Sequence, residues 1–198
     1  MSENGVDNKK RRFLTAATSV VGGVGIAFAA VPFITAMKPS ARAQAAGAPV
    51  EADISKLEPG QRMTVEWRGK PVWIVRRTEE SLKILEEMKG ILSDPDSNEN
   101  LQPEYAKNST RAIKPEYFIV VGICTHLGCS PSYIKSTDAH NLGSDWKGGF
   151  FCPCHGSRFD LAGRVYSGVP APLNLEVPAH NYVTETRVQI GVDPGAKS

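Results

Sequence analysis

The pattern of hydrophobic and polar residues divides the chain into an apolar N-terminal stretch and a longer region of short alternating segments. Residues 13–37 form a run of 25 residues without a charged side chain, and the basic residues 9–12 precede it. At 1.5 Å per residue, such a helix exceeds the roughly 20 residues needed to cross a bilayer. We therefore expect a transmembrane helix over 13–37, with residues 1–12 in the cytoplasm and the rest outside.

The same segment has features of an export signal. Arg11-Arg12-Phe13-Leu14 resembles a twin-arginine signal, although the usual spacing before Phe-Leu would make the pair Lys10-Arg11. A cleaved signal peptide is the alternative to an anchor, with Ala43-Gln44-Ala45 as an A-x-A site. We favour a retained anchor, because the uncharged span is longer than the apolar part of a usual signal peptide.

Residues 38–49 separate this anchor from the rest of the chain. They are Ala, Gly, Pro and polar residues without apolar periodicity, which predicts a flexible hinge. Residues 41–46 have good helix propensity, so part of the hinge is expected to be helical.

From residue 50 onward the pattern is mostly that of β-strands. Residues 62–67 alternate between polar and apolar side chains, Arg68-Gly69 predicts a turn, and 71–75 is the expected partner strand. Further strands are predicted over residues 117–123, 173–177 and 182–192.

One soluble helix and one long loop complete the predicted elements. In residues 79–89, Leu82, Leu85 and Met88 recur at helical spacing, and Thr78 is a suitable N-cap. Residues 94–115 are predicted to form a polar loop.

Composition narrows the classes of function. A chain of 198 residues has room for one globular domain and an appendage. A net charge of +2 with 22% charged residues does not provide the basic field of a nucleic-acid-binding protein. All four cysteines fall between residues 124 and 154, which favours a localised site over a scattered disulfide framework.

The chemistry lies in two short motifs, Cys124-Thr-His126-Leu-Gly-Cys129 and Cys152-Pro-Cys154-His155-Gly-Ser157. Each provides a thiolate and an imidazole, the ligand set in which two histidines replace two cysteines on one iron of a [2Fe-2S] cluster. Neutral imidazole lowers the negative charge of the cluster and raises its reduction potential.

A structural zinc site is the alternative for these residues, and it would make the protein an interaction module. Zinc would leave two spare cysteines and the twin-arginine-like start unexplained. His140 and His180 have no cysteine nearby, so they are expected in surface loops and not as ligands.

These motifs resemble those of the Rieske iron–sulfur proteins of the cytochrome bc1 complex. The resemblance covers nearly the whole chain, including the anchor, the hinge, both motifs and Gly168–Leu175 (GVPAPLNL). It implies a mainly β fold: an antiparallel β sandwich over residues 50–198, with an inserted cluster-binding subdomain at about 122–172, plus one N-terminal transmembrane helix.

The resemblance also implies a role for each ligand. Cys124 and Cys152 would bind the buried iron. His126 and His155 would bind the outer iron through Nδ1 and present Nε2 at the tip of the protein.

The same likeness implies support for the cluster from neighbouring residues. Ser157 would donate a hydrogen bond to a bridging sulfur, and the Pro170 loop would cover the cluster. The spare Cys129 and Cys154 would form a disulfide that holds the two motifs together. Phe159 stands where the family's high-potential pattern has a tyrosine, so one hydrogen bond to a cysteine sulfur is lost and a lower potential is expected.

The implied function is that of a quinol–cytochrome c oxidoreductase subunit in the bacterial inner membrane, with its domain on the periplasmic side. Quinol at the cytochrome b site would form a hydrogen bond with His155. One electron would go to the iron and one proton to the imidazole, so the reduction potential of the cluster would fall as pH rises. The head would then swing about residues 38–49 to the haem of cytochrome c1, within a dimeric complex.

The alternative is the Rieske subunit of another exported oxidoreductase, such as arsenite oxidase. A ring-hydroxylase ferredoxin is a poorer match, because it would lack both the anchor and the extra cysteine pair.

Overall fold

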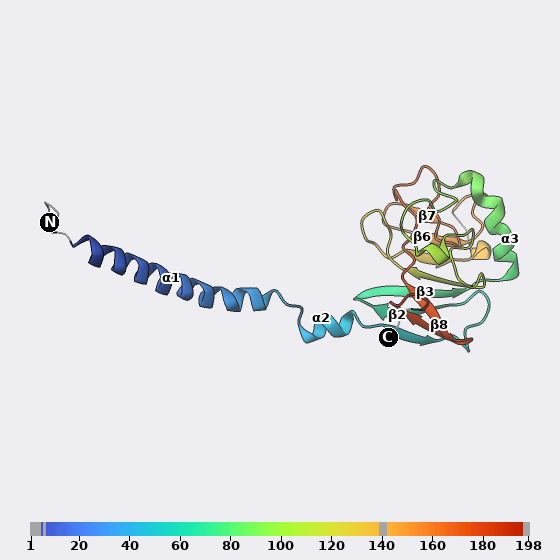
Figure 1. Cartoon of the computed structure of the whole chain (residues 1–198). Helices are drawn as coiled ribbons and strands as arrows, with labels where there is room; N and C mark the ends of the chain where they lie inside the picture. The colour runs from blue at the N-terminus through green and yellow to red at the C-terminus, as the bar shows by residue number, and fades with distance from the viewer. Residues whose placement is uncertain (1–4, 6, 139–141, 196–198) are drawn as a thin grey trace. The chain divides into compact units, whose positions relative to one another are not determined.

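The computed structural model describes residues 5, 7–138 and 142–195. The chain divides into two compact units, Met1–Ala45 and Ala46–Ser198 (Figure 1). The helices in chain order are α1 (Asn8–Ala36), α2 (Ala41–Ala46) and α3 (Glu79–Glu87), with short 3-10 helices at Met88–Ile91, Glu104–Ala106 and Ser136–Asp138. The strands are β1 (Val50–Asp53), β2 (Arg62–Trp67), β3 (Lys70–Arg76), β4 (Tyr117–Val121), β5 (Ser132–Ile134), β6 (Gly149–Phe151), β7 (Arg158–Phe159), β8 (His180–Thr184) and β9 (Arg187–Ile190).

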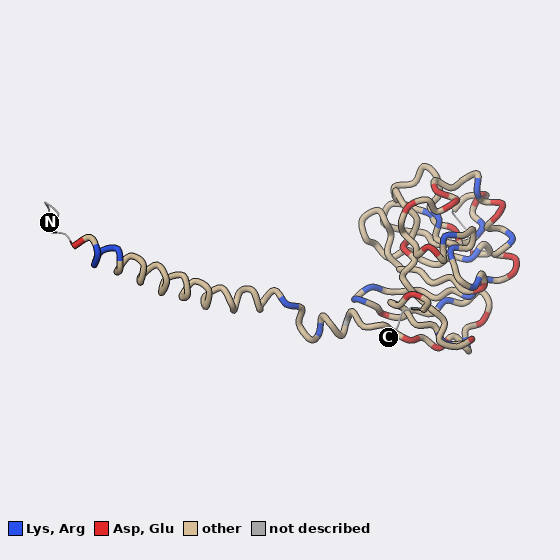
Figure 2. Tube along the Cα trace, in the orientation of Figure 1, with Lys and Arg blue, Asp and Glu red and all other residues tan. Residues whose placement is uncertain are grey.

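Helix α1 contains the predicted apolar span and starts five residues earlier than predicted. The Asp7 carboxylate accepts hydrogen bonds from the backbone N–H groups of Lys9 and Lys10, so the basic residues lie inside the helix. Its large apolar side chains are exposed, as with Phe13 at 71% and Phe28 at 75%. Figure 2 shows charged residues only near its start. Among the described residues, this is the helix with the length and hydropathy to cross a membrane.

Helix α2 lies within the predicted hinge and confirms the helical tendency of its alanines. The Ser40 hydroxyl accepts the N–H of Ala43, and the Ser40 carbonyl accepts the N–H of Gln44. The motion of residues 38–49 as a hinge remains a prediction, as do the domain boundaries placed at residues 12, 37 and 49.

The described residues of the globular unit form three antiparallel sheets of three strands each, which confirms the predicted fold class. Their strand orders are β1-β9-β8, β2-β3-β4 and β5-β6-β7. The hairpin β2–β3 turns at Arg68-Gly69, where both residues have positive φ, as a two-residue hairpin turn requires. In Figure 1, β2, β3 and β8 lie at one end of this unit, and β6 and β7 at the other.

Strands β3 and β4 are buried on both faces, which explains their unbroken apolar sequences. On one face, Val72 and Ile74 pack against residues of β1 and β9, which makes the sandwich. On the other face, Trp73 belongs to a second core that also contains Cys124 and Cys152. The sandwich therefore supports the two cysteines directly.

Helix α3 confirms the soluble helix predicted over residues 79–89. The Thr78 hydroxyl accepts the N–H of Ser81 as the N-cap, and Leu85 is buried. The α-helix ends at Glu87 and continues as a 3-10 turn.

Three of the predicted strands differ from the structure. The strand predicted over 117–123 ends at Val121, because the Ile123 N–H bonds back to the Val121 carbonyl. The segment 182–192 contains the C-terminal part of one strand and the whole of another, β8 and β9. The strand predicted over 173–177 is wrong. Its N–H groups at Leu175 and Val177 donate to carbonyls in two separate loops, so no ladder forms.

Candidate metal centre

The two predicted motifs fold into loops with the same backbone hydrogen bonds. In each loop the first residue donates its N–H to the carbonyl of the sixth, and the fifth donates to the carbonyl of the first. These N–O distances are 2.7 and 3.1 Å in loop 124–129, and 2.8 and 2.9 Å in loop 152–157. The fifth residue is Gly128 in one loop and Gly156 in the other, with φ of 81° and 80°, a conformation that favours glycine. The two loops therefore have equivalent backbones, although the histidine is the third residue of the first loop and the fourth of the second.

The two predicted cysteine ligands are buried as free thiols. Cys124 and Cys152 are each 2% exposed and belong to the same core, and their thiols are hydrogen-bonded to each other. The Cys124 sulfur also accepts hydrogen bonds from the His126 N–H and the Ser157 hydroxyl. Burial raises the pKa of the Cys124 thiol, so a bound cation is needed to hold its thiolate form.

The two predicted histidine ligands face each other at the outer end of the loops. The rings of His126 and His155 have centroids 4.7 Å apart and stand at 87° to one another. His155 is exposed and His126 is half-buried. Leu127, which follows His126, is 72% exposed, and Pro170 is exposed as well, so the site opens on an apolar tip.

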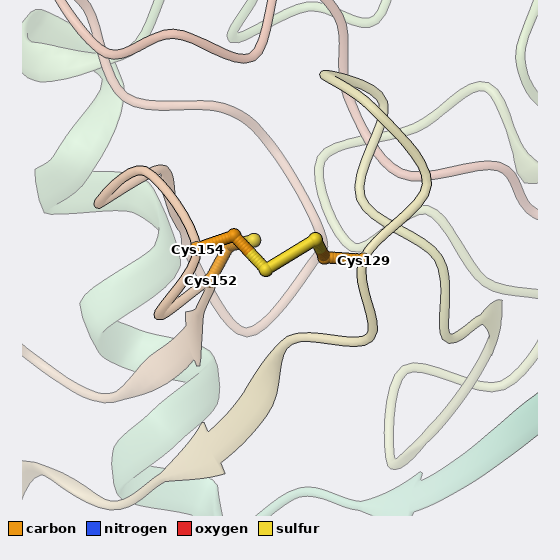
Figure 3. A group of neighbouring side chains, drawn as sticks. All are labelled: Cys129, Cys152 and Cys154. Carbon is orange, nitrogen blue, oxygen red and sulfur yellow. A yellow bond between two sulfur atoms is a disulfide. The ribbon is translucent and has the colours of Figure 1, made fainter.

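The two remaining cysteines form a disulfide between the loops, which confirms the predicted pairing (Figure 3). Cys129 lies in the first loop and Cys154 in the second, 25 residues apart in sequence. The Cys152 sulfur lies within 4.8 Å of both disulfide sulfurs. Since the disulfide uses two of these three sulfurs, only Cys152 of this group remains available as a metal ligand.

The segment that follows β7 is tied to both loops. The Ser157 hydroxyl accepts the Ala171 N–H at 3.0 Å, and the Thr125 hydroxyl donates to the Leu173 carbonyl at 2.6 Å. The role of Thr125 was not predicted from the sequence, because the bond joins residues 48 positions apart. Phe159 is fully buried in the same core as the two free cysteines.

His180 is not the surface residue that the sequence predicted. It is 1% exposed at the start of β8, and its Nδ1 lies 2.8 Å from the Pro178 carbonyl oxygen. Burial lowers the pKa of His180, so its imidazole is neutral at pH 7. Its ring contacts those of Tyr105 and Tyr182, and neither tyrosine belongs to the two loops. His140 lies outside the described residues.

The structure thus brings together the four predicted ligands and Ser157. Two buried thiols and two imidazoles at adjoining loop ends match the donor set of two cysteines and two histidines that one type of [2Fe-2S] cluster uses. Their coordination of iron remains a prediction.

Comparison with known proteins relates this site to characterised families. Residues 102–179 match the family described as Rieske [2Fe-2S] domain, and residues 1–40 match the family described as Ubiquitinol-cytochrome C reductase Fe-S subunit TAT signal. The chain is 60% identical over 196 residues to the ubiquinol-cytochrome c reductase iron-sulfur subunit of Allochromatium vinosum, covering 99% of this chain and 95% of that protein. It is 44% identical over 191 residues to the subunit of the same name in Blastochloris viridis, covering 96% and 97%. It is also 44% identical over 145 residues to cytochrome b-c1 complex subunit Rieske-1, mitochondrial, of Arabidopsis thaliana, covering 73% and 46%.

Proposed function

This chain belongs to the family of ubiquinol–cytochrome c reductase iron–sulfur subunits, and from that membership we propose that it passes single electrons from quinol to cytochrome c1. In this proposal its partners are cytochrome b and cytochrome c1 in a dimeric complex, and quinol binds where cytochrome b meets the tip of this chain. Family membership decides against a structural zinc module and against a subunit of arsenite oxidase.

One observation carries the proposal: two buried free thiols lie in contact behind a pair of facing imidazoles. We assign Cys124 and Cys152 to one iron of a [2Fe-2S] cluster, and the Nδ1 atoms of His126 and His155 to the other. When bound, this cluster takes up and releases one electron at a potential above that of an all-cysteine cluster.

The residues around the buried cysteines and those around the exposed histidines have different functions in this proposal. The apolar core around Cys124 and Cys152 excludes water from the thiolates. At the outer end, the Nε2 atom of exposed His155 accepts a hydrogen bond from the quinol hydroxyl and then holds its proton. Exposed Leu127 docks against the apolar wall of the quinol site. Because this imidazole takes up a proton when the protein is reduced, the potential should fall as pH rises.

Helix α1 is proposed to remain as a single-pass anchor in the bacterial inner membrane. Its basic start favours a cytoplasmic N-terminus, which places the globular unit on the periplasmic side. The disulfide agrees with that oxidising compartment. Export by the twin-arginine route would deliver this unit already folded with its cofactor.

Deletion of the gene for this chain, followed by complementation, tests the proposed function. Membranes of a strain that lacks this chain should lose quinol–cytochrome c reductase activity, and the full-length chain should restore it. Full reductase activity without the chain would contradict the proposed function.

Stiffening the linker should slow electron delivery if the head must move. Three prolines inserted after Gly47 would hold the segment extended, so steady-state reductase turnover should fall several-fold. Cluster content and reduction potential should not change, because the insertion lies outside the globular core. Three glycines at the same place lengthen the linker without stiffening it and serve as the control. Equal turnover in the two variants would count against a mobile head.

Phe159→Tyr should raise the reduction potential. Phe159 is buried in the core that holds both free cysteines, and a tyrosine hydroxyl there can donate to a cysteine sulfur and stabilise the more negative reduced form. The expected rise is a few tens of millivolts, since one hydrogen bond contributes roughly 1 kcal/mol and a tenfold change in a one-electron equilibrium is about 59 mV. Voltammetry of the full-length protein in detergent measures it.

Ser157→Ala is the reverse experiment. It removes a hydroxyl that donates to the Cys124 sulfur, so the potential should fall by a similar amount. A potential that stays constant or drops in Phe159→Tyr, beside a clear fall in Ser157→Ala, would show that the hydrogen-bond explanation fails at residue 159.

A further inference from the structure

Three arginines that the proposed mechanism does not use are buried together in the globular unit. Arg77 is 2% exposed, and Arg111 and Arg164 are each 0% exposed. We refer to these three residues as the arginine group. Arginine is rarely buried without a paired acid, so a set of three requires an explanation.

All three side chains converge on the turn formed by residues 160–164, directly after β7. Within the turn, the Arg164 side chain donates from Nε to Oδ2 of Asp160 at 2.7 Å, and its Nη2 lies 2.7 Å from the same oxygen. The other Asp160 oxygen accepts the N–H groups of Ala162 and Arg164 at 2.9 and 2.8 Å. Every lone-pair direction of this carboxylate is therefore used inside the turn.

The other two arginines bind backbone carbonyls of the same turn. Arg77 Nη1 lies 3.2 Å from the Leu161 oxygen, and Arg111 Nη1 lies 3.1 Å from the Ala162 oxygen. Within the described residues, Nη2 of Arg77 and Nε of Arg111 have no hydrogen-bond partner. These two guanidinium groups are thus held by neutral oxygens and not by an acid.

The positive charge of the group exceeds the negative charge buried with it. Among the described residues, Asp160 is the only carboxylate in the fully buried set, so three guanidinium groups face one carboxylate. Asp94 and Glu86 also act on the group, but Asp94 is half-buried and Glu86 is exposed, where water screens their charges. Burial lowers the pKa of Arg77 to about 9 and that of Arg111 to about 10, which leaves both protonated at neutral pH.

This excess charge borders the core that contains the two free cysteines. The guanidinium of Arg77 lies 5.2 Å from the centroid of the Phe118 ring, and Phe118 belongs to the same core as Cys124 and Cys152. Phe159, which precedes the turn, packs in that core as well. An apolar medium of this kind screens charges weakly, so a charge at its border acts across it more strongly than it would through water.

We propose that the arginine group raises the reduction potential of this chain's metal centre by placing uncompensated positive charge behind it. Gain of one electron makes the centre more negative, and fixed positive charge stabilises that reduced form over the oxidised one. The inference rests on the proposed function, because it requires the [2Fe-2S] cluster at the predicted ligands. It assigns to the arginine group a role separate from the hydrogen bonds of Ser157.

A pair of substitutions at Arg77 separates charge from structure. Both Arg77→Gln and Arg77→Lys lose the contacts of Nη1 with the Thr110 and Leu161 carbonyls, but only lysine keeps the positive charge. Arg77→Gln should lower the midpoint potential, and Arg77→Lys should stay close to the unaltered protein. Redox titration of the full-length protein followed by electron paramagnetic resonance gives both values. Measurement at pH 6 favours the protonated form of a buried lysine over measurement at neutral pH.

A second substitution adds negative charge without deleting an arginine. The Gln102 side-chain oxygen accepts a hydrogen bond from Arg111 at 2.8 Å, so Gln102→Glu keeps an acceptor there and pairs the guanidinium. It also loses the two hydrogen bonds that the amide nitrogen donates to the Ser97 and Glu99 carbonyls. It should lower the potential even if Arg77→Gln does not assemble a cluster. Arg187→Gln removes a positive charge whose side chain is 59% exposed, and it should leave the potential unchanged.

The outcomes distinguish this inference from the proposed function. Equal shifts in Arg77→Gln and Arg77→Lys, or an unchanged potential in Gln102→Glu, would overturn the electrostatic role while a Rieske signal in each sample upholds the proposed function. An unaltered chain that assembles no cluster would overturn the proposed function, and this inference with it.

Discussion

His155→Ala is expected to yield a folded chain that holds no [2Fe-2S] cluster. In the proposed site the second iron is held by two imidazoles only, and the His155 ring faces that of His126 at 4.7 Å between centroids. Alanine provides no ligand atom, and the exposed position leaves no neighbouring side chain fixed in its place. Iron and sulfide analysis, together with electron paramagnetic resonance of the reduced protein, should show loss of the signal.

The matched control is Leu127→Ala at the same tip. Leu127 is 72% exposed and has no ligand atom, so this variant should keep the cluster while weakening docking to the quinol site. His126→Ala should behave like His155→Ala. A normal Rieske spectrum in either histidine variant would show that the ligand assignment is wrong.

The two loops of the proposed site were predictable from sequence because the predicted ligands are local. Each loop holds its cysteine and histidine within six residues, and a glycine at the fifth position imposes the backbone conformation. The apolar runs that became β3 and β4 were equally clear, since strands buried on both faces need no alternation. Short-range patterns therefore specified both the loops and the sheet beneath them.

The errors came from residues whose partners are distant in sequence. The segment 173–177 has the alternation of a strand, but the Asn174 side-chain oxygen accepts the Val165 N–H at 2.8 Å and its neighbours bond to other loops. His180 is a polar residue and was predicted in a surface loop, yet its ring packs against two tyrosine rings. Periodicity reports which face of an element is apolar, but it does not report which loop will bind a given backbone group.

The burial of the arginine group was not predicted for the same reason, since its partners are distant in sequence. Arg111 lies in the stretch predicted as a polar loop, and it is fully buried. The residues next to it in the sequence do not indicate that burial. The hydrogen-bond partners of its side chain are 9 to 64 residues away. Charged side chains are exposed in most proteins, so sequence reasoning places them on the surface unless tertiary contacts are known.

Loss of the disulfide should produce the second large effect, on stability. The Cys129–Cys154 bond closes a loop with a sequence separation of 25 residues, and its removal increases the conformational entropy of the unfolded chain. In the chain-entropy model, a loop of this size contributes about 3–4 kcal/mol to the free energy of unfolding. For a chain of this length, that corresponds to a fall in Tm of roughly 10 °C.

The double variant Cys129→Ser and Cys154→Ser is the suitable change. A single substitution would leave a free thiol close to the Cys152 sulfur, which lies within 4.8 Å of both disulfide sulfurs, and that thiol would compete as a ligand. The double variant should also lose its cluster more readily on heating, because only the disulfide joins the loops covalently at the ligand end. Scanning calorimetry and the optical spectrum, recorded on the same full-length sample, follow unfolding and cluster loss together.

A reductant provides the control for this experiment. Thiol reductant should lower the Tm of the unaltered protein toward that of the double variant, and it should leave the double variant unchanged, since that variant has no disulfide to reduce. Serine differs from cysteine by one atom, so packing changes are small beside the loss of loop closure. A double variant whose Tm and cluster lifetime equal those of the unaltered protein would mean that the hydrogen bonds of the two loops suffice to hold the ligands in place.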